Sequence, residues 1–504
     1  METVDGIILG SGHNSLVLQA YLAKAGLDVV CLEQGPTIGG GLATVEWPES
    51  SGFLHNTHSF FHRGITRMPW FRELELERHG ASYLQPDLNV AVISDDGQQL
   101  LEWRTNFDDT LTSFEKVDSR DAETLKTWRT RFQPIVREIL EPEAQRPPLP
   151  PAERERQLRE TAHGRLLLET AELSPLEFVQ REFRHPFVQA ALLFFNGLRE
   201  VDLTVRGFGH HIPALLASDG KAQMCAGGSA NLAKALVSAI EEAGGRIFPD
   251  TTPTKIDGLT VETDRGVFKA RKFVASGLNP QQTFLELLEP QQLPVGWRGK
   301  AENFRYNLLA PLFALNVNLS EPPRYANSAA DEALMVVTGV RDIAQFEEIV
   351  ASHKRGEIPP SRVMWGSCPS QFDSTQSPPD KHTAFMWEKL PYRLNWDERK
   401  SAHGEVILAE WRKFAPNLES AVVDWLVSSP LDTERRLPNM REGDLLVGAF
   451  AHGQVGFNRP FSGAGAYRTA IDGLYLCGGS CHPGGNVTGL PGYNCAQVIL
   501  ADHG

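Results

Sequence analysis

The chain has 504 residues, which is enough for two or three domains with a sizeable core. With 41% hydrophobic and 22% charged residues, its composition is that of an ordinary globular protein. The net charge of −14 argues against nucleic acid as a partner, because an acidic chain has little with which to displace counterions from phosphates.

The sequence also narrows the expected cellular setting. It contains no run of 18 apolar residues that could span a bilayer, and the first predicted strand starts too close to Met1 to leave room for a signal peptide. The six cysteines are scattered without a CxxC pair, which is typical of free thiols in a reducing compartment. We expect a cytoplasmic protein, with peripheral membrane contact left open and no prediction of oligomeric state.

The N-terminal stretch has the order of elements that a dinucleotide site requires: strand, glycine turn, helix, strand. In this arrangement Gly10 permits the tight turn, Gly12 lets the backbone approach a pyrophosphate, and the helix directs its unsatisfied N–H groups at that anion. The four predicted pieces are Asp5–Leu9, Gly10–Ser15, Leu16–Gly26 and Asp28–Glu33.

Two further positions indicate which dinucleotide fits. Ser15 stands at the third glycine position of the fingerprint, where the helix must pack closely on the strand, and a serine is small enough. Glu33, 21 residues after Gly12, can accept both hydroxyl protons of an adenosine ribose, and its charge would repel a 2′-phosphate. The site therefore suits FAD or NAD better than NADP, the alternative being a βαβ unit without a ligand.

Three later segments carry a family resemblance: the glycine loop Gly39–Thr44, the segment Gly52–His58, and the C-terminal run Gly473–Gly489 with its HPGG turn. Together with the first turn and the middle segment Phe273–Pro280, they resemble the phytoene desaturase and carotenoid isomerase family of FAD-dependent oxidoreductases. That family includes desaturase-type carotene ketolases and many uncharacterised relatives. The resemblance is weak between these segments.

The resemblance implies an α/β fold, with a glutathione-reductase-type, FAD-binding Rossmann domain and an inserted α+β substrate domain. The FAD domain would be discontinuous, built from residues 1–66, 222–290 and 440–504. The substrate domain would consist of residues 67–221 and 291–439.

The resemblance also implies which residues meet FAD. The backbone near Thr254 would meet the adenine side, and the closing helix from about Gly489 to Leu500 would begin at the flavin, where its N-terminus stabilises the reduced ring by about 1 kcal/mol. The expected cofactor residues are Gly10, Gly12, His13, Asn14, Ser15, Glu33, Gly40, Gly41, Thr254, Ser276, Gly277, Gly479, Gly485, Asn486 and Val487.

The middle of the chain gives mainly structural predictions. Residues Asp121–Leu140 have the apolar spacing of a helix, with a kink possible at a proline, and the proline-rich run Glu141–Pro151 predicts a loop. Ser174–Glu177 predicts a capping box. Pro186–Asn196 predicts an apolar helix that ends at Gly197 and is buried in the core, lines an apolar cavity or touches a membrane surface, burial in the core being the commonest case. Phe313–Leu319 alternates as a strand does, and its polar face is expected to meet solvent more often than a pocket.

No catalytic residue stands out. His58, after the glycine loop, could take the proton that accompanies hydride loss, and Tyr493 could border the pocket over the flavin, although a structural role is at least as good an interpretation for each. Cys477, Cys481 and His482 have the composition of a metal cluster but lack a second ligand pair, so we expect no metal.

The predicted function is an FAD-dependent oxidoreductase that desaturates an apolar or cyclic small molecule by hydride transfer to flavin N5. The sequence has no second glycine fingerprint, so electrons would leave to oxygen, a quinone or a carrier. Two alternatives stay open: an isomerase that uses reduced FAD, and a non-catalytic flavoprotein that acts by binding a partner.

Overall fold

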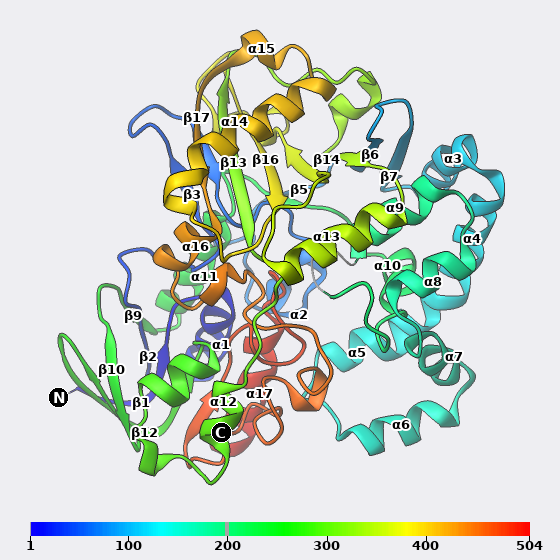
Figure 1. Cartoon of the computed structure of the whole chain (residues 1–504). Helices are drawn as coiled ribbons and strands as arrows, with labels where there is room; N and C mark the ends of the chain where they lie inside the picture. Colours follow the sequence, from blue (N-terminus) through cyan, green and yellow to red (C-terminus); the bar gives the residue numbers. More distant parts are fainter. Residues whose placement is uncertain (1, 197–200, 504) are drawn as a thin grey trace.

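The computed structural model describes residues 2–196 and 201–503, with the side chains of residues 195 and 196 also left undescribed. Two seven-stranded sheets organise this part of the chain, and a group of helices covers one side of the molecule (Figure 1). The predicted helix end at Gly197 lies outside the described residues.

The first sheet has parallel strands at its centre, in the order β12, β1, β2, β9, with β18 beside β12. Apolar runs without alternation suit these strands because helices cover both faces. Antiparallel β10 and β11 extend the sheet beyond β12. The strands are β1 (Glu2–Leu9), β2 (Val29–Leu32), β9 (Arg246–Phe248), β10 (Pro253–Asp257), β11 (Thr260–Thr263), β12 (Gly266–Ser276) and β18 (Leu474–Leu476).

Three helices pack together beside this sheet. The predicted first helix is α1 (His13–Lys24), and it packs against α11 (Ala230–Glu242) and the closing helix α17 (Leu490–His503). Figure 1 shows the red C-terminal helix next to the blue N-terminal strand and helix. The two ends of the chain therefore meet, as the shared cofactor site requires.

The second sheet has the order β17, β13, β16, β15, β14, β6, β7 and is mostly antiparallel, with β14 and β6 parallel. The side chains of β16 alternate between two hydrophobic cores. Phe385 and Trp387 belong to the core that this sheet shares with the helices between residues 107 and 217, whereas Ala384 and Met386 belong to the core on the opposite face. Its strands are β6 (Leu88–Ser94), β7 (Leu100–Arg104), β13 (Leu312–Leu319), β14 (Met335–Val340), β15 (Met364–Ser367), β16 (His382–Lys389) and β17 (Val422–Ser428).

The strand predicted at Phe313–Leu319 is confirmed as part of β13, but its predicted solvent-facing polar side is wrong. Asn316 and Asn318 are buried, and the segment of β3 (Thr44–Glu46) and β4 (Leu54–Asn56) lies over Asn318, whose amide N–H donates to the Trp47 carbonyl oxygen at 3.3 Å. The Asn318 amide oxygen is 2.8 Å from His55 Nε2. Asn318 therefore makes polar contacts inside the protein, whereas the Asn316 amide is buried without a hydrogen-bond partner among the described residues.

The remaining helices lie mostly in the middle of the chain. The Ser174 capping box is confirmed, and so is burial of the apolar helix, whose apolar side chains from Phe187 to Phe194 are in the core. The helices are α2 (Pro69–Glu73), α3 (Phe107–Val117), α4 (Ser119–Ile135), α5 (Glu141–Ala144), α6 (Pro151–Glu160), α7 (Ala162–Ala171), α8 (Pro175–Glu182), α9 (Pro186–Asn196), α10 (His211–Ala217), α12 (Trp297–Glu302), α13 (Ile343–Arg355), α14 (Trp396–Phe414), α15 (Leu418–Ala421) and α16 (Pro430–Arg436). The short strands are β3 (Thr44–Glu46), β4 (Leu54–Asn56), β5 (Tyr83–Leu84) and β8 (Met224–Cys225).

The loop predicted over Glu141–Pro151 is wrong at its start. Helix α4 continues through a π-helical turn, Val136–Leu140, into α5, so the irregular loop is confined to residues 145–150. Pro142 is tolerated because it stands in the first turn of the new segment, where a missing N–H breaks no intrahelical bond.

The first sheet takes its strands from residues 2–32, 246–276 and 474–476, and the second from residues 88–104 and 312–428. The division into an FAD domain and a substrate domain remains a prediction. Within the described ranges, no helix has the length and apolar character needed to cross a bilayer.

Candidate functional site

A cavity of about 1450 Å³ lies among the glycine turns and extends to the second sheet. Sites for a single small molecule are usually about 300–1,000 Å³. The cavity therefore has room for a dinucleotide and a second molecule. Its wall has a glycine-rich part and an apolar part, which are described in turn.

The N-terminal turn forms an open cradle. Gly10 has φ +81°, and a Cβ added at Gly12 would meet no atom within 4 Å. Helix α1 begins at His13 without a side-chain cap, and residues from Gly10 to Ser15 line the cavity. The N–H groups of the first helical turn are thus available to an anion such as a pyrophosphate.

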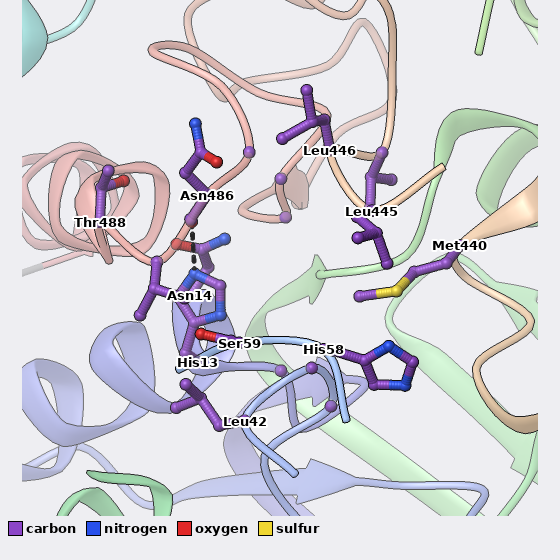
Figure 2. A pocket seen from close by; sticks show the side chains of 18 of the residues that line it. His13, Asn14, Leu42, His58, Ser59, Met440, Leu445, Leu446, Asn486 and Thr488 are labelled. Carbon is purple, nitrogen blue, oxygen red and sulfur yellow. Dashed lines mark hydrogen bonds between the residues drawn. The ribbon is translucent and has the colours of Figure 1, made fainter. Parts of the chain in front are cut away.

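The C-terminal glycine turn lies against this cradle. His13 Nε2 is 3.0 Å from the carbonyl oxygen of Asn486, a contact that Figure 2 shows between the two turns. Asn486, at φ +80°, and Val447, at φ +52°, both line the cavity in the left-handed region that such residues rarely adopt. Backbone strain of this kind is typical of functional sites.

Glu33 is fixed on the cavity wall by three hydrogen bonds. The backbone N–H and hydroxyl of Ser11 donate to one carboxylate oxygen at 2.8 and 2.7 Å, and the Gly35 N–H donates to the other at 2.9 Å. The carboxylate is held at the end of β2, where the ribose of a bound dinucleotide would lie.

Most of the predicted cofactor residues share this one cavity. Ser276 does not line it: this residue is fully buried at the end of β12, and its hydroxyl is 2.7 Å from that of Thr283. Contacts of the others with FAD remain a prediction. The predicted residues that line the cavity are Gly10, Gly12, His13, Asn14, Ser15, Glu33, Gly40, Gly41, Thr254, Gly277, Gly479, Gly485, Asn486 and Val487.

Two buried charged side chains, Arg459 and Asp444, support the loop that closes the glycine-rich part. Arg459 is fully buried and donates to the carbonyl oxygens of Gly448, Ala449, Gln454 and Gly479 at 3.1–3.4 Å. Burial lowers the pKa of Arg459 to about 10, which leaves it charged at neutral pH. Asp444 accepts backbone hydrogen bonds from Asn307, Leu446 and Gly448. No sequence pattern points to this role for either residue.

The rest of the wall is apolar and largely aromatic. Phe60 packs edge-on against Trp387 with ring centroids 5.6 Å apart, and Trp365 is 6.3 Å from Trp387. No sequence pattern distinguishes these residues from ordinary core. The apolar wall includes Phe60, Phe61, Val90, Trp103, Val136, Leu140, Leu312, Met335, Trp365 and Trp387.

The candidate base His58 lines the cavity but is poorly suited to accept a proton. Arg436 donates to His58 Nε2 at 2.6 Å, so the proton of the neutral ring is assigned to Nδ1. Burial, together with the charge of Arg436, lowers the pKa of His58 to about 3. The His58 ring is therefore neutral, and with so low a pKa it is a weak proton acceptor.

Tyr493 is not among the residues that line the cavity. Its ring packs edge-on against Tyr21 with centroids 5.4 Å apart, at the junction of α1 and α17. The cluster suggested by Cys477, Cys481 and His482 likewise gives no site: in the described part of the chain no three metal-ligating side chains are grouped.

Four histidines near the glycine turns make stability depend on pH: His55, His58 and His62 are buried, and His13 is half-buried. Burial lowers the pKa of His13 and His55 to about 4 and of His58 and His62 to about 3. The unfolded chain, with histidine pKa near 6.5, therefore binds protons that the native state does not. Each residue then removes up to about 1.4 kcal/mol of unfolding free energy per pH unit as the pH falls below about 6.5. We expect the midpoint of thermal unfolding to drop between pH 6.5 and 5; a constant midpoint would contradict this assignment.

Comparison with known proteins agrees with this geometry. The model of the NAD(P)-binding Rossmann-like domain matches residues 8–74. One of the subunits of limonene dehydrogenase from Castellaniella defragrans is 26% identical over 100% of this chain and 96% of the relative. Prolycopene isomerase of Arabidopsis thaliana is 25% identical over 55% of this chain and 45% of the relative.

Solved structures show the same fold at low identity. A variant of putrescine oxidase has a TM-score of 0.62 at 14% identity, covering 99% of both chains. Cyclohexylamine oxidase from Brevibacterium oxydans has a TM-score of 0.62, also at 14% identity and 99% of both chains.

The fold and the paired glycine turns define an α/β FAD-dependent oxidoreductase, as predicted. These similarities agree with the resemblance to the phytoene desaturase and carotenoid isomerase family that the sequence shows. The cofactor of the protein is FAD, and the open cradle at Gly12 fits that group because a side chain there would occupy the space.

Proposed function

We propose that this protein is an FAD-dependent dehydrogenase that removes hydrogen from an apolar, cyclic small molecule. The observation that carries the proposal is the continuity of the cavity: the glycine cradle and the aromatic wall of Phe60, Trp365 and Trp387 belong to one space. Limonene, after which the relative aligned over the whole chain is named, is a cyclic hydrocarbon of this kind.

Each part of the cavity has a distinct task. FAD bound in the cradle supplies the hydride acceptor at flavin N5. The start of α1 would hold the pyrophosphate and Glu33 the ribose. The apolar wall would bind the ring, since each CH₂ group moved out of water contributes about 0.8 kcal/mol, and it would keep water away from the reacting carbon.

The charges of the wall disfavour cationic amines such as those after which the structurally similar oxidases are named. Lys389 and Arg436 line the cavity, with the Lys389 ammonium 5.7 Å from the centroid of the Trp365 ring. Three acidic side chains line the wall among the described residues: Glu33 is held by Ser11, Glu286 pairs with Arg441, and the charge of Glu141 acts on Arg137. A protonated amine would meet like charge, whereas a neutral ring would not.

The isomerase alternative has weaker support, because the prolycopene isomerases align with 55% of the chain. A non-catalytic flavoprotein is the remaining alternative. Oxygen, a quinone or a carrier remains the proposed electron acceptor, and a cytoplasmic location with peripheral membrane contact remains a prediction.

The test is an anaerobic titration of the purified yellow protein, followed by flavin absorbance. Limonene and other cyclic alkenes form one arm, and putrescine and cyclohexylamine form the other. We expect cyclic alkenes to bleach the flavin and the amines to leave it oxidised. Bleaching by the amines, with no response to any cyclic alkene, would contradict the proposal.

A further inference from the structure

One cation on the cavity wall has no carboxylate partner. Arg436, the last residue of α16, lines the cavity, and none of the ion pairs among the described residues includes it. Its neighbour Arg435 pairs with Asp397 outside the cavity wall. Asp432, whose charge acts on Arg436, itself pairs with Lys400 at 2.9 Å. The positive charge of Arg436 is therefore not offset by an ion pair.

His58 fixes the Arg436 side chain without neutralising it. The Arg436 Nη2 group donates to His58 Nε2 at 2.6 Å, and His58 is buried. The imidazole is neutral, because burial and the charge of Arg436 lower the pKa of His58 to about 3. A guanidinium has five N–H donors, and Arg436 makes this one hydrogen bond within the part of the chain that the structure describes. The contact therefore leaves a full positive charge in a defined position.

The contact lies where the two parts of the cavity join. His58 and Ser59 come directly before Phe60 of the aromatic wall, and all three line the cavity. Figure 2 shows His58 on the Met440 side of the cavity, with Asn486 of the C-terminal glycine turn on the opposite side of the view. Since the start of α1 is the proposed pyrophosphate site, the flavin ring of a bound FAD would reach this junction, next to a substrate on the aromatic wall.

A cation at this junction acts on the reduced flavin more than on the oxidised one. A hydride carries two electrons and one proton, so its transfer to the neutral oxidised ring leaves that ring with one negative charge. Leu437 and Met440, which follow Arg436 in the chain, line the cavity and are apolar, so they screen little of the attraction between opposite charges. A charge that is already in place needs no reorganisation when the negative charge appears.

We propose that the charge of Arg436 stabilises the reduced flavin, and that His58 is a positioning residue that holds the guanidinium on the cavity wall. This inference rests on the proposed function for the place of the flavin ring in the cavity. Because the oxidised ring is uncharged, Arg436 raises the reduction potential of the flavin and contributes little to the retention of FAD. Neither residue takes a proton from the substrate.

The test measures the two-electron reduction potential of the flavin in the purified FAD-loaded protein, by equilibration with dyes of known potential. We expect Arg436→Gln to make the potential about 30 mV more negative, which is a tenfold change in a two-electron equilibrium. Arg436→Lys keeps the positive charge and should recover more than half of this shift. The flavin content of both variants should equal that of the wild-type protein.

The matched control is Arg435→Gln. It removes an exposed arginine from the adjacent position of α16, outside the cavity wall, and should leave the potential unchanged.

Two further variants test the positioning role of His58. His58→Leu removes the group that accepts the hydrogen bond from Arg436, and we expect it to lower the potential by about 15 mV, a threefold change in the equilibrium. The amide oxygen of His58→Gln can accept the same hydrogen bond, so this variant should restore the wild-type potential. A potential that His58→Leu leaves unchanged would contradict the positioning role.

The outcomes separate this inference from the proposed function. Equal potentials in Arg436→Gln and the wild-type protein overturn the role of Arg436. Loss of FAD from Arg436→Gln, with no change of potential in the flavin that remains, also overturns it, because the cation would then serve the phosphates of FAD. If cyclic alkenes still bleach the flavin in either case, the dehydrogenase stands. A potential that depends on Arg436, without bleaching by any ring compound, supports the role of Arg436 and contradicts the dehydrogenase.

Discussion

Replacement of Gly12 by Asp is expected to yield a folded protein that purifies without FAD. Gly12 has φ −61°, which any residue adopts, and an added Cβ meets no protein atom within 4 Å. The new side chain would therefore leave the fold unstrained while it occupied the cradle and placed a negative charge beside the pyrophosphate. Like charges about 4 Å apart cost several kcal/mol near a protein surface, so FAD affinity should fall roughly 100-fold or more.

The matched control is Gly299→Asp. Gly299, on α12 and outside the cavity wall, also has open space around its Cβ position. This variant should keep its full flavin content. Flavin is measured from absorbance after denaturation, and folding from the circular dichroism of both apoproteins. A Gly12→Asp protein with normal flavin content would refute the cradle assignment.

Replacement of Arg459 by Met is expected to lower the free energy of unfolding by about 3–5 kcal/mol. The guanidinium donates to four carbonyl groups and lies over the ring of Phe450, with its Cζ atom 4.5 Å from the centroid. Without it, those carbonyl oxygens and the buried carboxylate of Asp444 lose their cation. The loop Leu445–Val447, which lines the cavity, should loosen as a result.

The measurement is urea unfolding of the apoproteins, so that cofactor binding does not mask the change. Arg468→Met serves as the control, because Arg468 is half exposed and pairs with Asp502 at the surface. Such a pair contributes at most about 1 kcal/mol. If Arg459→Met unfolded with no larger change than this control, the support role of Arg459 would be disproved.

The cofactor half of the site could be predicted from sequence because its signals are local. The turn at Gly10 and Gly12, the helix that follows and the acid at Glu33 form one βαβ unit, and the observed β1, α1 and β2 match the predicted elements closely. The family resemblance predicted that this unit meets the C-terminal turn. The contact between His13 and Asn486 shows how the two ends join.

The substrate half could not be predicted, because its wall is assembled by tertiary packing. Leu312, Trp365 and Trp387 come from three different strands. In each strand the pattern of apolar residues is the same whether a side chain faces the core or the cavity. The polar residues of β13 looked solvent-facing because no local signal shows that the distant segment with Trp47 and His55 covers this face. Likewise, His58 and Arg436 are 378 residues apart and meet only in the fold.

The most direct test of the central claim is a single anaerobic turnover with product analysis. The FAD-loaded protein is mixed with an excess of the cyclic compound that perturbs its flavin spectrum most. We predict full bleaching of the flavin and one equivalent of a product that has lost two hydrogen atoms per FAD. A product of unchanged mass, or a flavin that stays oxidised across the whole panel of ring compounds, would contradict a dehydrogenase.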